Sequence, residues 1–291
     1  CSLICALAVF LARRKKLLIA IAGIMPTVIF QSSMYTYDGV CFSCITLGVV
    51  LCVNELERKK ETRKVRNLVV SAAFIGMGCV AKPVYFPLMF LLVPCIWERV
   101  KPLLNSKRNR HICALILGIS ILLIAGVATI KMKPLLYNMA EGNLNYLGDS
   151  RGGDTGVSGQ LLNIAEHPFA FGKMLIQEIF SFDNFRNAGD EVENTTLVCN
   201  QMFLNLYILG TLKEVWALIL LPLLLLIFLV EPQGEPRFIY KKRTFRGYCI
   251  VATVASVVLV WLAMYLTFSP IGEDCIQGVQ ARYFLPLFLP F

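Results

Sequence analysis

The stretch LLIAIAGIMPTVIFQSSMYTYDGVCFSCITLGVVLCV, residues 17–53, contains two long apolar runs joined by a short polar turn. Its only charged side chain is Asp38, which lies between the run at 17–30 and the run at 39–53. Such runs predict two membrane helices that form a hairpin with Asp38 at its tip. Asp38 is therefore either the N-cap of the second helix or a carboxylate kept there for binding or catalysis.

The rest of the chain has the same apolar character. Of its 291 residues, 57% are hydrophobic and 16% are charged, whereas about a quarter of a soluble domain is charged. Further apolar runs lie at 1–12, 68–81, 84–97, 112–130, 215–230, 247–268 and from 284 onward. We expect an all-α, polytopic transmembrane bundle, one domain over 1–291 with about eight or nine membrane segments. Because both ends lie in apolar runs, we expect an internal piece, truncated at both ends, of a longer protein.

Basic residues gather in four clusters at 13–16, 54–67, 98–111 and 231–246. These clusters hold 20 of the 28 Lys and Arg but only 6 of the 19 acidic residues, so they carry +14 and the rest of the chain carries −5. The positive-inside rule predicts that the clusters are cytoplasmic loops of a plasma-membrane protein, next to the anionic leaflet. The runs between successive clusters are even in number, as this topology requires. A charge distributed in this way argues against nucleic acid as a partner.

The two hairpins at 17–53 and 68–97 are short for membrane crossings. A run of 14 residues spans about 21 Å as a helix, less than the roughly 30 Å of the hydrocarbon core. The helices therefore either extend into their polar tips or recess these tips into the outer leaflet.

The predicted topology places residues 131–214 on the outer face. The glycine-rich part at 141–159 is expected to be a flexible connector or a mobile lid. Residues 160–182 are periodic and predict one interfacial helix, and 198–210 predicts a second interfacial segment. The apolar stripe of the first helix consists of Phe171, Met174, Leu175, Ile179 and Phe182.

Lys82 is expected on the same outer face. Pro83 follows it and suits the first turn of a helix. Lys82 is either an amine that reaches to the membrane interface or a contact for phosphate. The runs at 112–130 and 247–268 contain no charged residue and no histidine, which argues against an ion path through the bilayer.

Cysteine and histidine indicate no metal site. Most of the 11 cysteines lie in or beside apolar runs, which predicts packing rather than disulfide or redox chemistry. His167 has no partner at metal-ligand spacing. The motifs of soluble nucleotide-binding and hydrolytic enzymes are missing from the sequence.

Four stretches carry a resemblance to a known family: MYTYDG (34–39), AKPVYFPLMFLLVP (81–94), GVSGQLLNIAEHP (156–168) and SPIGEDCIQGVQARYFLPL (269–287). With them, the chain resembles a bacterial family of multi-pass membrane proteins, catalogued as domain of unknown function 2142, over about residues 31–287. The last motif usually reads GVQGRYFLP in that family, and here Ala281 replaces its second glycine.

The resemblance implies a layout similar to that of the GT-C glycosyltransferases, which take a sugar from a polyprenyl-phosphate carrier at the extracytoplasmic face. It implies a polyprenyl-phosphate-linked sugar as donor, a glycan as acceptor, and a principal catalytic carboxylate in a first outer loop upstream of Cys1. We expect Asp38 to be catalytic, as a base or as a supporting carboxylate, with Lys82 and Arg282 on the carrier phosphate. The expected substrate-binding residues are Tyr37, Lys82, Tyr85, Gln160, His167, Gln280, Arg282 and Tyr283.

The expected function is sugar transfer in the assembly of cell-surface polysaccharide or cell-wall glycan, with membrane lipid around the protein. One alternative is a transporter or flippase of a lipid-linked solute. Another is a non-catalytic scaffold of a polysaccharide-assembly complex. The cofactor stays open, with a divalent cation as one option.

Overall fold

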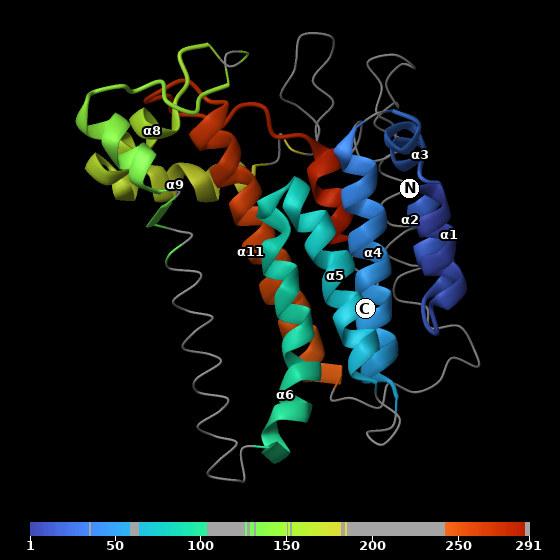
Figure 1. The fold of residues 1–291 in the computed structure, drawn as a ribbon. Coiled ribbons are helices and arrows are strands. Elements are labelled where there is room, and N and C mark those ends of the chain that lie inside the picture. The colour runs from blue at the N-terminus through green and yellow to red at the C-terminus, as the bar shows by residue number, and fades with distance from the viewer. Residues whose placement is uncertain are drawn as a thin grey trace. The chain divides into compact units, whose positions relative to one another are not determined.

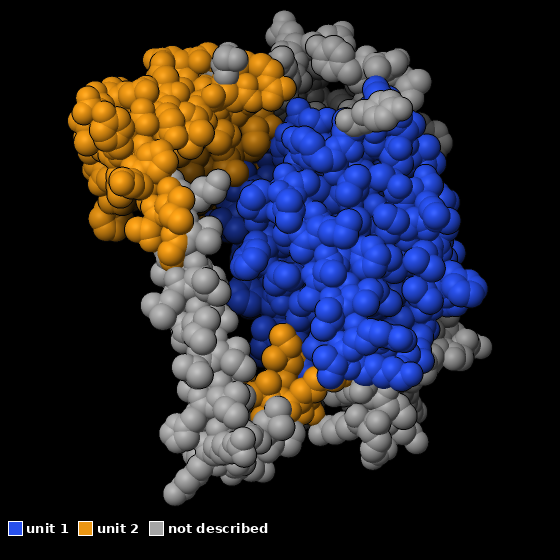
Figure 2. All heavy atoms as spheres, viewed as in Figure 1, with its two compact units in different colours: residues 1–95, 180–260, 279–291 blue, residues 96–179, 261–278 orange. Residues whose placement is uncertain are grey.

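The computed structural model describes residues 1–34, 36–58, 64–103, 126, 129–130, 132–149, 151, 153–181, 184 and 242–288. Across these residues the regular secondary structure is helical and no strand occurs, which confirms the all-α membrane bundle (Figure 1). The chain divides into two compact units (Figure 2). Unit 1 comprises 1–95, 180–260 and 279–291, and unit 2 comprises 96–179 and 261–278. The single domain expected over 1–291 stays a prediction.

Unit 1 begins with three short helices, α1 (Ser2–Leu11), α2 (Lys16–Ile24) and α3 (Pro26–Ser33). The run at 17–30 is therefore broken, because Pro26 cannot donate the backbone hydrogen bond that would continue α2. The segments Lys16–Ile24 and Thr27–Ser33 meet at a bend of 60°. Together they are long and apolar enough to form one broken span or a re-entrant loop.

The next two helices, α4 (Tyr37–Leu56) and α5 (Val65–Ala81), pack closely against each other (Figure 1). A Cβ atom at Gly48 would lie 2.6 Å from Cγ1 of Ile75, and one at Gly78 would lie 2.6 Å from Cγ1 of Ile45. Both glycines therefore allow the two backbones to approach, as small residues do between membrane helices. The Ser71 hydroxyl donates a hydrogen bond of 2.6 Å to the carbonyl of Gly48 and fixes the same contact.

Helix α4 shows how the first hairpin reaches the length of a membrane crossing. It has 20 residues, which corresponds to about 30 Å. The helix is longer than the apolar run at 39–53 because it includes Tyr37 and Asp38 of the polar tip and also residues 54–56 at its other end. The helix therefore has the length of a crossing, and whether its tip extends beyond the outer leaflet or is recessed into it stays a prediction.

After α5 the chain forms the 3-10 helix η2 (Pro83–Leu92), then α6 (Val93–Leu103). Pro87 within η2 cannot donate a backbone hydrogen bond, which disfavours a regular α-helix there. The later described elements are α11 (Lys242–Thr267) and the 3-10 helix η5 (Ala281–Leu287). The core of unit 1 joins α4, α5, η2 and the first part of α11 through residues such as Ile45, Ile75, Leu88, Phe245 and Ala252.

Three described helices are long and apolar enough to cross a membrane, Tyr37–Leu56, Pro83–Lys101 and Thr244–Thr267, and the bent α2–α3 pair would make a fourth. Large apolar side chains are exposed on α5 and α11, including Val69, Val80, Ile250 and Val251. Lipid is the natural solvent for such surfaces, which agrees with a multi-pass membrane protein.

At the opposite end of α4 from Asp38, charged side chains from the basic clusters are buried. Nε of Arg14 lies 3.3 Å from Oε1 of Glu57, and these side chains are only 9% and 5% exposed. Glu55 is 1% exposed and accepts a hydrogen bond of 2.9 Å from Nδ2 of Asn67. These contacts connect the end of α4 to the α1–α2 turn and to the start of α5, so the clusters are partly structural.

Unit 2 contains α8 (Val157–Glu166) and α9 (Pro168–Ile179), together with the last turns of α11. The single helix predicted over 160–182 is wrong, because the chain breaks at His167, directly before Pro168. The predicted stripe residues Phe171, Met174, Leu175 and Ile179 are half-buried, and Phe182 lies outside the described residues. The Phe171 and Tyr265 ring centroids lie 5.0 Å apart, so this stripe packs partly against protein.

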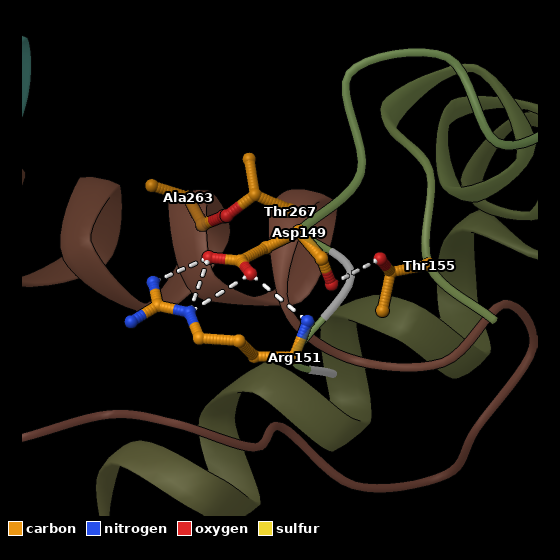
Figure 3. Close-up of polar contacts among 5 residues, drawn as sticks. All are labelled: Asp149, Arg151, Thr155, Ala263 and Thr267. Carbon is orange, nitrogen blue, oxygen red and sulfur yellow. Dashed lines mark hydrogen bonds and ion pairs between the residues drawn. The ribbon is translucent and has the colours of Figure 1, made fainter. Parts of the chain in front are cut away.

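The glycine-rich loop at 141–159 is held by many hydrogen bonds, several of them shown in Figure 3. The Thr155 hydroxyl donates to the carbonyl of Asp149 at 2.8 Å, and the guanidinium of Arg151 grips the Asp149 carboxylate. The backbone N–H of Asp149 donates to the carbonyl of Thr267 at 2.8 Å. The described part of this loop is therefore fastened to the end of α11 instead of forming an open connector.

Several predicted segments lie outside the described residues. These are the spans at 112–130, apart from residues 126 and 129–130, and at 215–230, and the interfacial segment at 198–210. Their crossings stay predictions.

Seven of the described cysteines are buried without a disulfide, as expected for packing residues: Cys5, Cys41, Cys44, Cys52, Cys79, Cys95 and Cys249.

Candidate functional site

Three segments that are far apart in the sequence meet at one cluster in unit 1. The first turn of α4 contributes Tyr37 and Asp38, and the junction of α5 and η2 contributes Lys82. The segment that begins η5 contributes Arg282 and Tyr283. We call these five residues the Asp38 cluster.

The Asp38 carboxylate lies between two cations. The Lys82 ammonium donates a hydrogen bond to Oδ1 of Asp38, and Nε of Arg282 lies 3.4 Å from Oδ2. The Asp38 side chain is 8% exposed, the Lys82 side chain 14% and the Arg282 side chain 31%. A mostly buried carboxylate is thus paired through both of its oxygens, as burial of charge requires.

Aromatic rings surround the two cations. Nζ of Lys82 lies 3.8 Å from the ring centroid of Tyr283 and 5.1 Å from that of Tyr37. Cζ of Arg282 lies 5.5 Å from the Tyr283 centroid. These distances are within the range of cation–π attraction. The exposed edge of the cluster includes Tyr37, which is 57% exposed.

Tyr85 fixes the backbone of the third segment. Its side chain is buried, and its hydroxyl donates a hydrogen bond of 2.8 Å to the carbonyl of Tyr283. The segment that carries Arg282 is thereby attached to η2, the helix that follows Lys82. Tyr85 therefore positions the segment of the cluster that carries Arg282, and its contact with a substrate stays a prediction.

The local sequence explains why these groups are presented together. Thr36 is the N-cap of α4 and makes no side-chain cap, and Asp38 is the second residue of the helix. The N-cap interpretation of Asp38 is therefore wrong, although a carboxylate in the first turn still interacts favourably with the helix dipole. Pro83 occupies the first position of η2, as predicted, and leaves Lys82 extended before it.

The cluster has an excess of positive charge, because one carboxylate faces two cations. Burial lowers the pKa of Lys82 below the ordinary 10.5, and the hydrogen bond with Asp38 only partly offsets this effect. No described residue accepts a hydrogen bond from the Nη groups of Arg282, whose side chain is partly exposed. The arrangement can therefore bind an anion, with Arg282 as the reachable donor.

Six of the nine predicted site residues are brought together: Tyr37, Asp38, Lys82, Tyr85, Arg282 and Tyr283. Gln280 precedes this group as the N-cap of η5, without a side-chain cap. The predicted role of Gln280 in substrate binding stays a prediction.

Gln160 and His167 belong to unit 2, not to the Asp38 cluster's unit. Gln160 is fully buried, and its amide nitrogen donates to the carbonyls of Ser269 at 3.2 Å and Pro270 at 2.7 Å. Both amide hydrogens are therefore used by the protein, which gives its predicted role in substrate binding no support. His167 is exposed at the C-cap of α8.

Further residues that support these two regions were not predicted from the sequence. Gln31, in α3, is 3% exposed, and its carbonyl accepts a hydrogen bond of 3.4 Å from the Thr36 hydroxyl just before Asp38. A glutamine directly after the apolar run at 17–30 was the available signal. Asn163 donates a hydrogen bond of 2.9 Å to the Tyr265 hydroxyl, and nothing in the spacing of these residues predicted it.

Among the described residues, no group of three His, Cys, Asp or Glu is placed to hold a metal ion.

The comparisons with known proteins agree with the motif-based resemblance. The chain matches no curated protein and no solved structure. The model of the family described as "Predicted membrane protein (DUF2142)" matches residues 1–290. This match includes the segments of the Asp38 cluster, at 37–38, 82 and 282–283. The chain therefore belongs to this family of membrane proteins.

Proposed function

We propose that the protein is a membrane glycosyltransferase with a GT-C-like layout. It transfers a sugar from a polyprenyl-phosphate carrier to a glycan acceptor at the extracytoplasmic face of the cell membrane, in cell-surface polysaccharide or cell-wall assembly. The observation that carries the proposal is the convergence of Asp38, Lys82 and Arg282, with two tyrosine rings, at one end of a membrane helix.

The charges of the cluster suit the leaving group of this reaction. When a glycosyl bond to a phosphate carrier breaks, negative charge develops on the phosphate, and preplaced cations stabilise it. Arg282 offers a planar pair of donors that matches phosphate oxygens, and Lys82 adds a compact charge behind it. The excess positive charge of the cluster would be neutralised by such a ligand.

Asp38 acts in this proposal as a supporting carboxylate. Both of its oxygens already face cations, so it orients Lys82 and Arg282 instead of taking a proton from the acceptor. A carboxylate that activates the acceptor hydroxyl must then come from another part of the protein. The tyrosine rings supply flat, amphipathic surfaces on which a sugar can pack.

The orientation follows from the charge distribution. The four basic clusters are cytoplasmic under the positive-inside rule, and the Asp38 end of α4 then faces outward. A lipid-linked sugar reaches such a site from the outer leaflet, so the phosphate is delivered at the depth of the membrane surface.

The direct test is release of the carrier. Purified full-length protein is incubated with a panel of radiolabelled polyprenyl-phosphate sugars, with and without a chelator of divalent cations. We expect carrier release with at least one donor, and its loss in Asp38→Asn, Lys82→Ala and Arg282→Ala at normal membrane insertion. Arg151→Ala, which removes an exposed arginine of unit 2, is the matched control and should retain activity.

Wild-type turnover in all three variants would remove the Asp38 cluster from the active site. Movement of an intact lipid-linked sugar across vesicles without carrier release would identify a flippase. No turnover and no movement with any donor would favour a scaffold.

A further inference from the structure

The last turn of α11 holds the other elements of unit 2. The Tyr265 hydroxyl accepts a hydrogen bond of 2.9 Å from Asn163 in α8. Its ring lies 5.0 Å from that of Phe171 in α9, centroid to centroid. The backbone N–H of Asp149 in the loop at 141–159 donates to Thr267 at 2.8 Å. Two helices and a loop are therefore fixed at one depth along α11.

That depth corresponds to the membrane surface. The apolar part of α11, Thr244–Thr267, has 24 residues and is about 36 Å long, more than the roughly 30 Å of the hydrocarbon core. Its last turn therefore reaches the interface, where tyrosine is enriched. Elements attached to Tyr265 and Thr267 lie at the boundary between lipid and water.

Helix α9 exposes a second apolar row on the side away from Tyr265. Phe169 is 92% exposed and Ile176 is 61% exposed, and Lys173 lies between them on the same side. At about 100° per residue, these three side chains lie within about 60° of one another and opposite Phe171. Phe171 of the predicted stripe thus packs against Tyr265, and a different row of α9 is exposed.

The loop at 141–159 presents another uncovered apolar side chain. Leu147 is 60% exposed and has a φ of 63°, in the left-handed region that a leucine rarely occupies. It lies two residues before Asp149, whose N–H is bound to the end of α11. The loop is therefore held with its leucine outward beside the same membrane interface.

We propose that Leu147, Phe169 and Ile176 insert into the lipid leaflet at this end of α11, and that Lys173 contacts lipid phosphate. Lipid is the apolar phase present at this depth, and the mixture of aromatic, aliphatic and lysine side chains matches the interface. Unit 2 is then a platform lying partly in the membrane surface. The proposal does not depend on the function of the Asp38 cluster.

Photo-crosslinking in lipid nanodiscs tests this platform in the full-length protein. Benzoylphenylalanine replaces Leu147, Phe169 or Ile176 one at a time, and the discs contain a radiolabelled phospholipid. Glu166, which is exposed on α8, is the matched control for an aqueous position. Phe171, which packs on Tyr265, is the control for a protein-facing position of the same helix. Only variants that elute as monodisperse protein after purification are compared.

We expect at least fivefold more lipid adduct at positions 147, 169 and 176 than at positions 166 and 171. Equal lipid labelling at all positions would overturn the proposal. Crosslinks from 169 to protein instead of lipid would also overturn it: a crosslinked dimer would show that a second copy covers this row, and an internal crosslink that another part of the chain does.

Discussion

Two aspartates of this protein are each paired with arginine or lysine, in opposite circumstances. The Asp38 side chain is 8% exposed, and its partners Lys82 and Arg282 come from distant segments of unit 1. The Asp149 side chain is 29% exposed, and its partner Arg151 is only two residues away and 79% exposed. The second pair has the better geometry, since Arg151 reaches both carboxylate oxygens, at 3.0 Å and 2.6 Å (Figure 3).

The comparison shows that good pair geometry and energetic importance are different properties. An exposed pair between near neighbours needs only a suitable loop conformation. Water and salt screen it, so that it contributes between about 0 and 1 kcal/mol to stability. A buried cluster forms only when the fold brings its members together. Loss of one member then leaves a buried charge without its partner, which lowers the free energy of unfolding by about 3–5 kcal/mol.

The largest expected effect is that of Asp38→Ala. Because it leaves Lys82 and Arg282 facing each other without their common carboxylate, we expect it to destabilise unit 1 by about 3–5 kcal/mol. Apparent melting temperatures of detergent-solubilised protein measure the change. Asp149→Ala is the control and should shift the melting temperature only slightly. Similar shifts for both variants would show that burial does not distinguish the two aspartates.

A smaller loss is expected for Tyr85→Phe. The substitution leaves the partly buried carbonyl of Tyr283 without its hydrogen bond, at a cost of about 1–3 kcal/mol. Tyr137→Phe, at a position that is 65% exposed, is the matched control. Melting temperatures again report the difference, and an unchanged value for Tyr85→Phe would mean that η2 does not hold the Arg282 segment in place.

The Asp38 cluster should also respond to alkaline pH. Burial lowers the pKa of Lys82, so its ammonium is present below the lowered pKa and lost as pH rises through it, before the ordinary 10.5 is reached. As pH rises, affinity for a polyprenyl phosphate should therefore begin to fall before pH 10.5 is reached. Lys82→Arg should move this fall to higher pH, because arginine stays charged. An identical pH profile for the variant would exclude Lys82 as its cause.

The smallest effect is expected for Arg151→Ala. The hydrogen bonds from Arg151 lower the pKa of Asp149 to about 2, so their contribution is present above the ordinary 3.8 and lost as pH falls toward 2. At neutral pH the exposed pair contributes at most about 1 kcal/mol. Melting temperatures at neutral pH should differ little between Arg151→Ala and wild type. A large drop would place this pair among the structural interactions of unit 2.

The sequence was sufficient for the class of fold and for most of the Asp38 cluster. Apolar runs predict membrane helices because every backbone N–H and C=O group in the hydrocarbon core must be hydrogen-bonded within the protein. Asp38, Lys82 and Arg282 stood out because each is a charged residue beside an apolar run. The predicted topology placed these three residues on the same outer face, so we expected them to lie near one another.

Other features depend on packing that a single sequence does not encode visibly. The division of 160–182 into α8 and α9 was signalled by Pro168, but the periodic pattern around it concealed the break. Gln160 appeared as a polar residue free for a ligand, whereas it binds the backbone of a loop more than one hundred residues away. Glu55 lies in a predicted cytoplasmic basic cluster, and nothing in the spacing indicated that it is buried with Asn67 as its hydrogen-bond donor.

The most direct measurement compares two arginines in polyprenyl-phosphate binding. Dissociation constants are determined for the full-length protein, for Arg282→Met and for Arg151→Met, in the same detergent and at the same salt. If the Asp38 cluster holds the carrier phosphate, Arg282→Met weakens binding at least tenfold and Arg151→Met leaves it unchanged. Equal affinities for all three proteins, or an equal loss in both variants, would contradict the assignment of a phosphate to this cluster.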